Sequence, residues 1–230
     1  MPRDTLLIFA AAPRLGVVKR RLARGIGAMA ALRFHRAQLA QMARGPGRDR
    51  RWRSVLVLAP GGAGLAPARG GAGGLPAWLL RGFPQRAAQG GGDLGQRLAR
   101  CTARHPGRVV VIGSDIPGIT AADIAAAFRA LGRADAVFGP AEDGGFWLAG
   151  LAPRRPSRPF GAVRWDSEHA LADTLANFTG RRIALLRTLR DIDTAEDLWA
   201  LRQDRAAWTG LRKLRARPAP PRRAERKRQR

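Results

Sequence analysis

Residues Val109–Gly118 read VVVIGSDIPG, and this stretch decides the fold. Four branched aliphatic residues in a row, without polar alternation, are typical of a strand buried on both faces of a sheet. The Pro-Gly turn that follows ends the strand and carries Ser114 and Asp115 beyond it. Such a strand predicts a parallel sheet covered by helices, with ligand-binding residues at the carboxyl ends of the strands.

Short apolar runs and helical patterns alternate on either side of this stretch. Strands rich in β-branched residues are predicted at Thr5–Ala10, Ser54–Ala59, Arg108–Gly113, Ala134–Gly139 and Arg182–Leu186. Apolar residues three and four apart predict amphipathic helices at Leu22–Met42, Asp93–Ala103, Ala121–Leu131, Glu168–Phe178 and Thr194–Gln203. This alternation predicts an α/β fold with a mostly parallel central sheet and helices on both faces.

The composition is that of a globular protein and excludes several other classes. With 230 residues, 45% of them hydrophobic and 26% charged, the chain is long enough to bury a core. No apolar run approaches the roughly 18 to 20 residues of a membrane-spanning helix. The chain has one cysteine, Cys101, and three histidines, so a zinc site with four Cys or His ligands would need all of them, and we expect no structural zinc site. Asp4 interrupts a superficial likeness of Met1–Pro13 to a signal peptide, so we expect a cytoplasmic protein.

The chain is strongly basic, with 42 Lys and Arg against 17 Asp and Glu and a net charge of +25. Nearly all of these cations are arginine, which a codon bias in a GC-rich genome would explain, although so large a charge attracts polyanions at low salt. Arg212–Arg230 holds ten basic residues and one acidic residue, and we expect a disordered tail that binds polyanions non-specifically. Residues 1–211 are expected to form one domain, with a flexible glycine-rich loop at Gly61–Gly74.

The turn after the first predicted strand is a candidate anion site. Pro13 and Gly16 favour a tight turn, and Arg14, Lys19 and Arg21 surround it where a helix begins. Free backbone N–H groups, a helix N-terminus and basic side chains together suit a diphosphate. The alternative is a solvated turn in a chain that is basic throughout.

Three aspartates, Asp115, Asp143 and Asp193, each follow a predicted strand and are expected to converge on one face. Carboxylate oxygens, together with phosphate oxygens of a substrate, are the ligands that Mg²⁺ and Mn²⁺ prefer. Asp143 is followed by Gly144 and Gly145, which allow the backbone to approach a ligand closely. Structural roles remain open, because an Asp also caps turns and helices and Asp-Gly is the commonest hairpin turn.

Two further helix starts carry polar or aromatic residues. In QGGGDLGQRL, residues Gln89–Leu98, Asp93 and Gln96 fit a capping box, and the glycines before them allow a ligand near the helix N-terminus. In VRWDSEHALADT, residues Val163–Thr174, Trp165 lies just ahead of another helix. We expect both segments to lie near the ligand.

Taken in order, these motifs resemble a known family. IFAAAPRLGVVKRRLA, QGGGDLGQRL, VVVIGSDIPG, FGPAEDGGFWLAGL, RWDS and DIDTAEDL are similar to the bacterial domain of unknown function 2064 (DUF2064) group of GT-A-fold, glycosyltransferase-like proteins. Some members are described as arsenosugar biosynthesis glycosyltransferases, and relatives by fold include guanylyltransferases acting on molybdenum cofactor and on phospholactate. The resemblance runs from Leu6 to Leu201 and implies a three-layer sandwich that binds a nucleotide sugar.

The resemblance also implies roles for individual residues. Asp115 would help to hold a divalent metal on the donor diphosphate, and Asp193 would be a second metal ligand. The turn after the first strand would hold phosphates, and Asp93, Leu94 and Gly95 would lie near the nucleotide. Apart from the resemblance, the positions of four further residues at strand ends or ahead of a helix make them candidates for binding the substrate or nucleotide, namely Ser114, Gly144, Gly145 and Trp165. The family usually reads FAKAPRPGRVKTRL, whereas Ala11, Leu15 and Arg20 here replace its Lys, second Pro and Thr.

We therefore expect a cytoplasmic glycosyltransferase that uses Mg²⁺ or Mn²⁺ and transfers a sugar from a nucleoside-diphosphate donor to a small acceptor. The metal and the basic residues would offset the charge that develops on the leaving diphosphate. Asp143 would act on the acceptor, as a general base or by orienting a hydroxyl. Two alternatives stay open: a nucleotidyltransferase that releases pyrophosphate, and a non-catalytic anion- or RNA-binding protein built on a decayed site.

Overall fold

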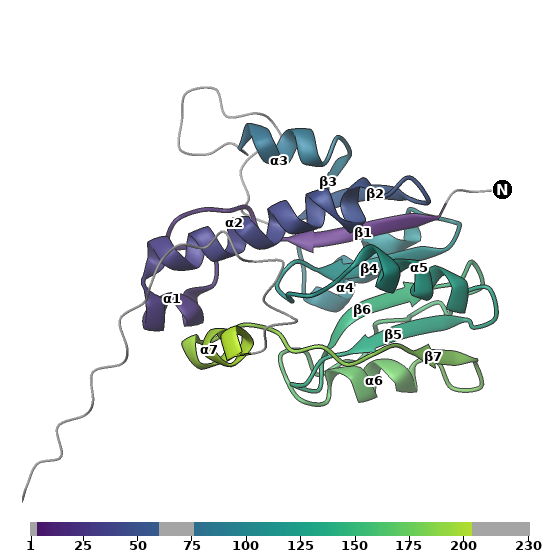
Figure 1. Ribbon diagram of the computed structural model, residues 1–230. Coiled ribbons are helices and arrows are strands. Elements are labelled where there is room, and N and C mark those ends of the chain that lie inside the picture. The colour runs from purple at the N-terminus through teal and green to yellow at the C-terminus, as the bar shows by residue number, and fades with distance from the viewer. Residues whose placement is uncertain (1–3, 60–75, 204–230) are drawn as a thin grey trace, which may run out of the picture.

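The computed structural model describes residues 4–59 and 76–203 (Figure 1). The glycine-rich segment Gly61–Gly74 and the basic segment Arg212–Arg230, for which we predicted a loop and a tail, lie outside these residues. No helix in the described part of the chain is long and apolar enough to cross a membrane.

A seven-stranded sheet forms the centre of the molecule, with the strand order β3-β2-β1-β4-β6-β5-β7. Neighbouring strands are parallel except that β6 runs antiparallel to β4 and β5. The bounds are β1 Thr5–Ala10, β2 Arg53–Leu58, β3 Arg86–Ala88, β4 Val109–Gly113, β5 Ala136–Pro140, β6 Phe146–Leu151 and β7 Ile183–Leu185. The predicted mostly parallel sheet is confirmed, and β3 and β6 are strands that the sequence patterns had not indicated.

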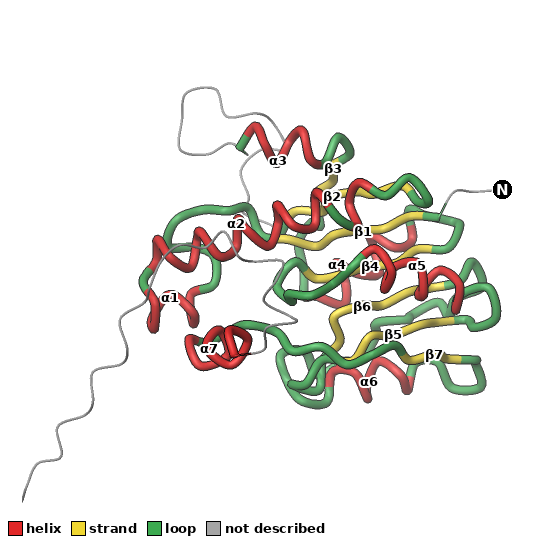
Figure 2. Tube along the Cα trace, in the orientation of Figure 1, coloured by secondary structure: helices red, strands yellow, loops and turns green. Residues whose placement is uncertain are grey.

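Helices cover both faces of this sheet and make a three-layer sandwich (Figure 2). Their bounds are α1 Arg20–Ile26, α2 Ala28–Arg44, the 3-10 turn η1 Pro46–Arg48, α3 Ala77–Gly82, α4 Leu94–Ala103, α5 Ala121–Ala130, α6 Ala170–Ala176 and α7 Ala195–Gln203. One core cluster joins α2, α3 and α5 to the even-numbered side chains of β1, β2 and β4. The opposite cluster joins α4 and α6 to the odd-numbered side chains of the same strands.

The single helix predicted at Leu22–Met42 is wrong, because the chain breaks at Gly27. Gly27 has a φ of 86°, which favours glycine, and its N–H donates a hydrogen bond to the Ala23 carbonyl as α1 ends. The break turns α1 away from α2. A third, smaller core cluster then forms between α1, α2 and α7, built on Leu22, Phe34 and Leu198.

Gly139 in β5 lies directly against the buried indole of Trp147 in β6. A Cβ atom at position 139 would lie 2.6 Å from Cζ2 and from Nε1 of Trp147. Trp147 cannot move away easily, since it is 1% exposed and its Nε1 donates to the Arg187 carbonyl at 3.0 Å. The pairing of β5 with β6 therefore depends on glycine at this position.

We predict that Gly139→Ala lowers the free energy of unfolding by about 1 to 3 kcal/mol through overpacking, measured by denaturant unfolding. Gly113→Ala is the matched control, because no atom lies within 4 Å of the place its Cβ would take. The control should change stability by no more than about 0.5 kcal/mol. Equal effects of the two substitutions would contradict this account of the β5–β6 pairing.

Candidate functional site

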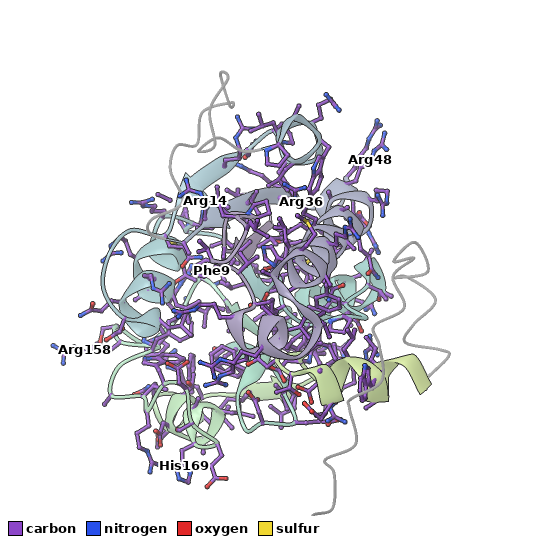
Figure 3. All side chains as sticks on the ribbon, turned by 90° about the vertical axis from the view of Figure 1, so that its left-hand side faces the viewer. Phe9, Arg14, Arg36, Arg48, Arg158 and His169 are labelled. Carbon is purple, nitrogen blue, oxygen red and sulfur yellow. The ribbon has the colours of Figure 1, made fainter. Side chains whose placement is uncertain are left out.

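Every strand except β6 ends at the same edge of the sheet. The segments that follow β1, β4, β5 and β7 therefore gather along this carboxyl edge, which faces left in Figure 1 and faces the viewer in Figure 3. Phe9, near the end of β1, and Arg14, in the loop that follows it, are labelled there. This is the edge where parallel α/β sheets bind their ligands.

Lys19 lies at the centre of this edge, between two carboxylates. Its Nζ donates a hydrogen bond to Oδ1 of Asp193 at 3.0 Å and lies 3.6 Å from Oδ1 of Asp115. The Lys19 side chain is 5% exposed, whereas those of Asp115 and Asp193 are 57% and 41% exposed. The ammonium is thus shielded from solvent, while both carboxylates still present surface to a ligand.

The backbone before α1 holds Lys19 in a special conformation. Lys19 has a φ of 50°, in the left-handed region that non-glycine residues rarely adopt. Ahead of it, the Arg14 N–H donates to the Ala12 carbonyl at 2.8 Å, and Gly16 takes a φ of 74° in the predicted tight turn. Strain of this kind is found mainly where the surrounding structure fixes a residue for function.

His35, on α2, is a site residue that we had not singled out. Its Nε2 lies 3.0 Å from the Ala11 carbonyl oxygen and its Nδ1 lies 3.7 Å from Oδ1 of Asp115. A carbonyl oxygen only accepts, so Nε2 carries the hydrogen in this contact. His35 is 2% exposed and joins the end of β1 to Asp115. Its sequence signal is a histidine on the apolar face of a predicted helix.

The pKa of Asp115 lies below its ordinary value. Partial loss of hydration raises this pKa, but the neighbouring His35 ring and the charge of Lys19 outweigh that effect. Asp115 therefore stays ionised over the whole neutral range. It keeps a negative charge ready for a cation or a polar ligand.

A second group of acids lies beside this network. The chain after β7 runs next to the end of β5, with the Leu189 N–H donating to the Pro140 carbonyl at 3.1 Å. This brings Asp191 and Asp193 toward Asp143. Burial, together with the charges of these two neighbours, raises the pKa of Asp191 to about 6. A carboxyl that titrates near neutrality in such a place is a candidate functional group.

Asp143 itself lies in the turn between β5 and β6. Its Oδ1 accepts a hydrogen bond from the Gly145 N–H at 2.9 Å, and Gly144 has a φ of 83°. The turn packs against the first turn of α6, where the Leu171 N–H donates to the Gly144 carbonyl at 3.0 Å. The hairpin alternative is thus the conformation that this Asp-Gly pair adopts, and the Asp143 side chain remains exposed at the edge.

The start of α4 forms a separate packed corner. The predicted capping box is confirmed: Oδ1 of Asp93 accepts from the Gln96 N–H at 2.8 Å, and Gln96 Oε1 accepts from the Asp93 N–H at 3.2 Å. Gly95 is buried, and its Cβ would lie 3.0 Å from the Trp165 indole. Trp165 meets Phe146 edge to face, with ring centroids 6.1 Å apart.

The predicted site residues therefore fall into distinct sets. Lys19, Asp115 and Asp193 form one network, which Arg21 joins through an Nη1 atom 3.6 Å from Asp193 Oδ2. Ser114 is adjacent but buried, and its hydroxyl has no hydrogen-bond partner among the residues described. The loop before Lys19 holds Pro13, Arg14 and Gly16. The β5–β6 turn holds Gly144 and Gly145 beside Asp143. The start of α4 holds Asp93, Leu94 and Gly95, with Trp165 packed against it.

The carboxylates fit one type of metal site. Within residues 4–59 and 76–203, no three His, Cys, Asp or Glu side chains are grouped closely enough to hold a metal by themselves. Mg²⁺, however, is commonly held by one or two carboxylates together with substrate phosphate oxygens. The exposed carboxylates of Asp115 and Asp193 suit that arrangement when a phosphate-bearing ligand is present.

The chain is similar in sequence and in structure to known proteins. Residues 43–167 match the sequence profile of a family described as "Uncharacterized protein conserved in bacteria (DUF2064)". A candidate nucleotide-diphospho-sugar transferase from Desulfovibrio desulfuricans G20 is 28% identical, with a TM-score of 0.78 over 92% of this chain and 95% of that one. The search of curated proteins found no match.

Two more distant structures share the fold alone. A 4-diphosphocytidyl-2C-methyl-D-erythritol synthase from Anaerococcus prevotii DSM 20548 is 9% identical, with a TM-score of 0.58 over 88% of this chain and 96% of that one. An inositol-1-phosphate CTP transferase from T. maritima is 11% identical, with a TM-score of 0.55 over 96% and 99% of the two chains. The fold is thus that of nucleotide-diphospho-sugar transferases and similar proteins.

Because the pKa of Asp191 is raised, removing its charge should increase the stability of the folded protein by an amount that depends on pH. The folded state binds the Asp191 proton more tightly than the unfolded state, so stability falls as the pH rises from about 4 to about 6. We predict that Asp191→Asn raises the melting temperature near pH 7 in the presence of EDTA. This gain should vanish below about pH 4, where the unfolded carboxyl is protonated too.

Thermal melts at the two pH values check this prediction, with the exposed Asp166→Asn as control. The control should shift the melting temperature by the same small amount at both values. A gain from Asp191→Asn that does not depend on pH would contradict the electrostatic origin of the effect.

Proposed function

Because the chain belongs to the DUF2064 family, we propose that it is a glycosyltransferase that binds a nucleoside-diphosphate sugar with Mg²⁺ or Mn²⁺ and transfers the sugar to a small acceptor. The observation that carries this proposal is the shielded Lys19 ammonium between Asp115 and Asp193 at the carboxyl edge of the sheet. The relative from D. desulfuricans, a candidate nucleotide-diphospho-sugar transferase, supports the donor class.

The cations of this edge would bind the donor diphosphate. Lys19 donates a hydrogen bond to Asp193, and its ammonium has further hydrogens for phosphate oxygens. Arg21 is 75% exposed beside the same carboxylate and can pair with a second phosphate. A divalent metal held by Asp115 and Asp193 would supply further positive charge against the leaving diphosphate.

His35 acts through Asp115 rather than on the donor. Its Nε2 is bound to the Ala11 carbonyl after β1, its Nδ1 lies 3.7 Å from the carboxylate, and together with Lys19 it keeps the Asp115 pKa low. A carboxylate that is already charged and oriented needs little rearrangement when the donor binds. His35 is therefore a positioning residue in this proposal.

The aspartates that follow β5 and β7, Asp143 and Asp191, would act on the acceptor. An acceptor hydroxyl must lose its proton as it attacks the sugar, and a carboxylate near it can accept that proton or orient the hydroxyl. We assign this role to Asp143, which is exposed at the turn. Asp191, with its pKa of about 6, lies close enough for the two charges to interact and could take the proton in its place.

Thermal stabilisation by ligands tests the donor site. We predict that one nucleoside-diphosphate sugar raises the melting temperature only when Mn²⁺ or Mg²⁺ is present, because a ligand of the folded state alone stabilises it by mass action. Asp115→Asn should abolish this shift. Asp49→Asn is the matched control, since Asp49 pairs with exposed Arg51 ahead of β2, at the opposite edge of the sheet.

The products separate glycosyl transfer from its alternatives. Release of a free nucleoside diphosphate from the stabilising donor, in the presence of an acceptor, supports the proposal. Release of pyrophosphate from a nucleoside triphosphate would instead establish nucleotidyl transfer. Stabilisation that ignores both the metal and Asp115→Asn would contradict a metal-dependent donor site and favour a non-catalytic anion-binding protein.

A further inference from the structure

A pocket lies near the other end of the strands, away from the carboxyl edge. It has a volume of about 580 Å³ and lies between the C-terminal half of α2, η1 and α3. Two of its lining residues, Arg48 and Pro84, come shortly before β2 and β3 begin, whereas Lys19 and Asp115 follow the ends of β1 and β4. Arg48 projects from the rim of the molecule when the carboxyl edge faces the viewer (Figure 3). The pocket is therefore separate from the proposed donor site.

Close backbone packing forms the walls of this pocket. A Cβ atom at Gly82 in α3 would lie 2.8 Å from the Cβ of Ala43 in α2, and one at Gly47 in η1 would lie 2.6 Å from the buried Phe83 ring. The guanidinium of Arg86 holds the end of α3, with Nη1 donating to the Phe83 carbonyl at 2.8 Å. Helix α3 is thus seated directly on α2 and η1.

The pocket is lined by three exposed arginines, Arg44, Arg48 and Arg81, and by no acidic residue. No ion pair joins the three pocket arginines to any residue that the structure describes. Residues 60–75, which precede α3, contain no Asp or Glu. Within the described residues, the pocket therefore gathers three arginines that have no carboxylate partner.

An aromatic side chain completes the pocket. Trp78 lines it and is half-buried, so its indole is anchored in the core on one side. Arginine recognises phosphate oxygens through paired N–H donors, and an indole offers a flat face on which a nucleobase stacks. The volume lies in the range of small-molecule pockets. We propose that this pocket binds a nucleoside phosphate, with the arginines on the phosphate and Trp78 against the base.

Calorimetric titration with AMP tests this proposal in the full-length chain. EDTA and the Asp115→Asn background remove the metal-dependent donor site, so failure of the proposed glycosyltransferase activity would not affect the result. At about 0.15 M salt, where non-specific attraction is reduced, AMP should still bind. Arg81→Glu and Trp78→Ala should each weaken binding about tenfold or more, and ribose 5-phosphate, which has no base, should bind about tenfold more weakly than AMP.

Arg133→Glu is the matched control, since it makes the same change of net charge at an exposed arginine outside the pocket. It should change the affinity less than about twofold. Equal weakening by Arg133→Glu and Arg81→Glu would overturn the proposal, because binding would then follow net charge alone. It would also be overturned if AMP does not bind, or if ribose 5-phosphate binds as well as AMP. Melting temperatures of the variants verify that each one folds.

The same titration with hexa-adenylate separates two sources of this ligand. If the oligomer binds more than about sixfold tighter than AMP and depends on Arg81 and Trp78, the natural ligand is a nucleotide within a single strand. If it binds no tighter than AMP, the ligand is a free nucleotide. Either result keeps the pocket as a nucleoside-phosphate site.

Discussion

The shielded ammonium of Lys19 is the contact on which the candidate site depends. It links three segments that are far apart in sequence: the loop after β1, the end of β4 at Asp115 and the approach to α7 at Asp193. A lysine that is 5% exposed needs such partners, because an unpaired charge shielded from water costs several kcal/mol. The carboxylates in turn are held at one place on the edge, with their remaining surface open to a ligand.

This ionic contact relies on apolar packing nearby. The cluster of α1, α2 and α7 includes Ile192, the neighbour of Asp193, which is fully buried. Gly25 allows α1 to pack closely on α7, since a Cβ at position 25 would lie 2.6 Å from the Cβ of Ala195 in α7. The break at Gly27 that splits the first helical region is what allows α1 to pack in this way. Gly25 and Gly27 thus allow the helix packing that holds Asp193 next to Lys19.

Much of this arrangement could be predicted from the sequence, because the spacing of apolar residues and the residue types in turns depend only on neighbouring positions. The strand Val109–Gly113, the cap at Asp93 and the position of Asp115 after a strand all follow from neighbouring residues. The link from Lys19 to Asp193 spans 174 residues, and no local pattern reports such a contact. The same holds for Asp191, whose pKa depends on Asp143 across the edge, and for the pocket at the opposite edge, whose walls come from α2 and α3.

A double-mutant cycle between Lys19→Met and Asp193→Asn tests the central claim most directly. The free energy of unfolding of the two single variants and the double variant is measured by denaturant titration without metal. If the ammonium holds the approach to α7 in place, the coupling energy should be about 1 kcal/mol or more, since the two groups are in contact. Effects that add within about 0.3 kcal/mol would contradict the claim that this contact organises the edge.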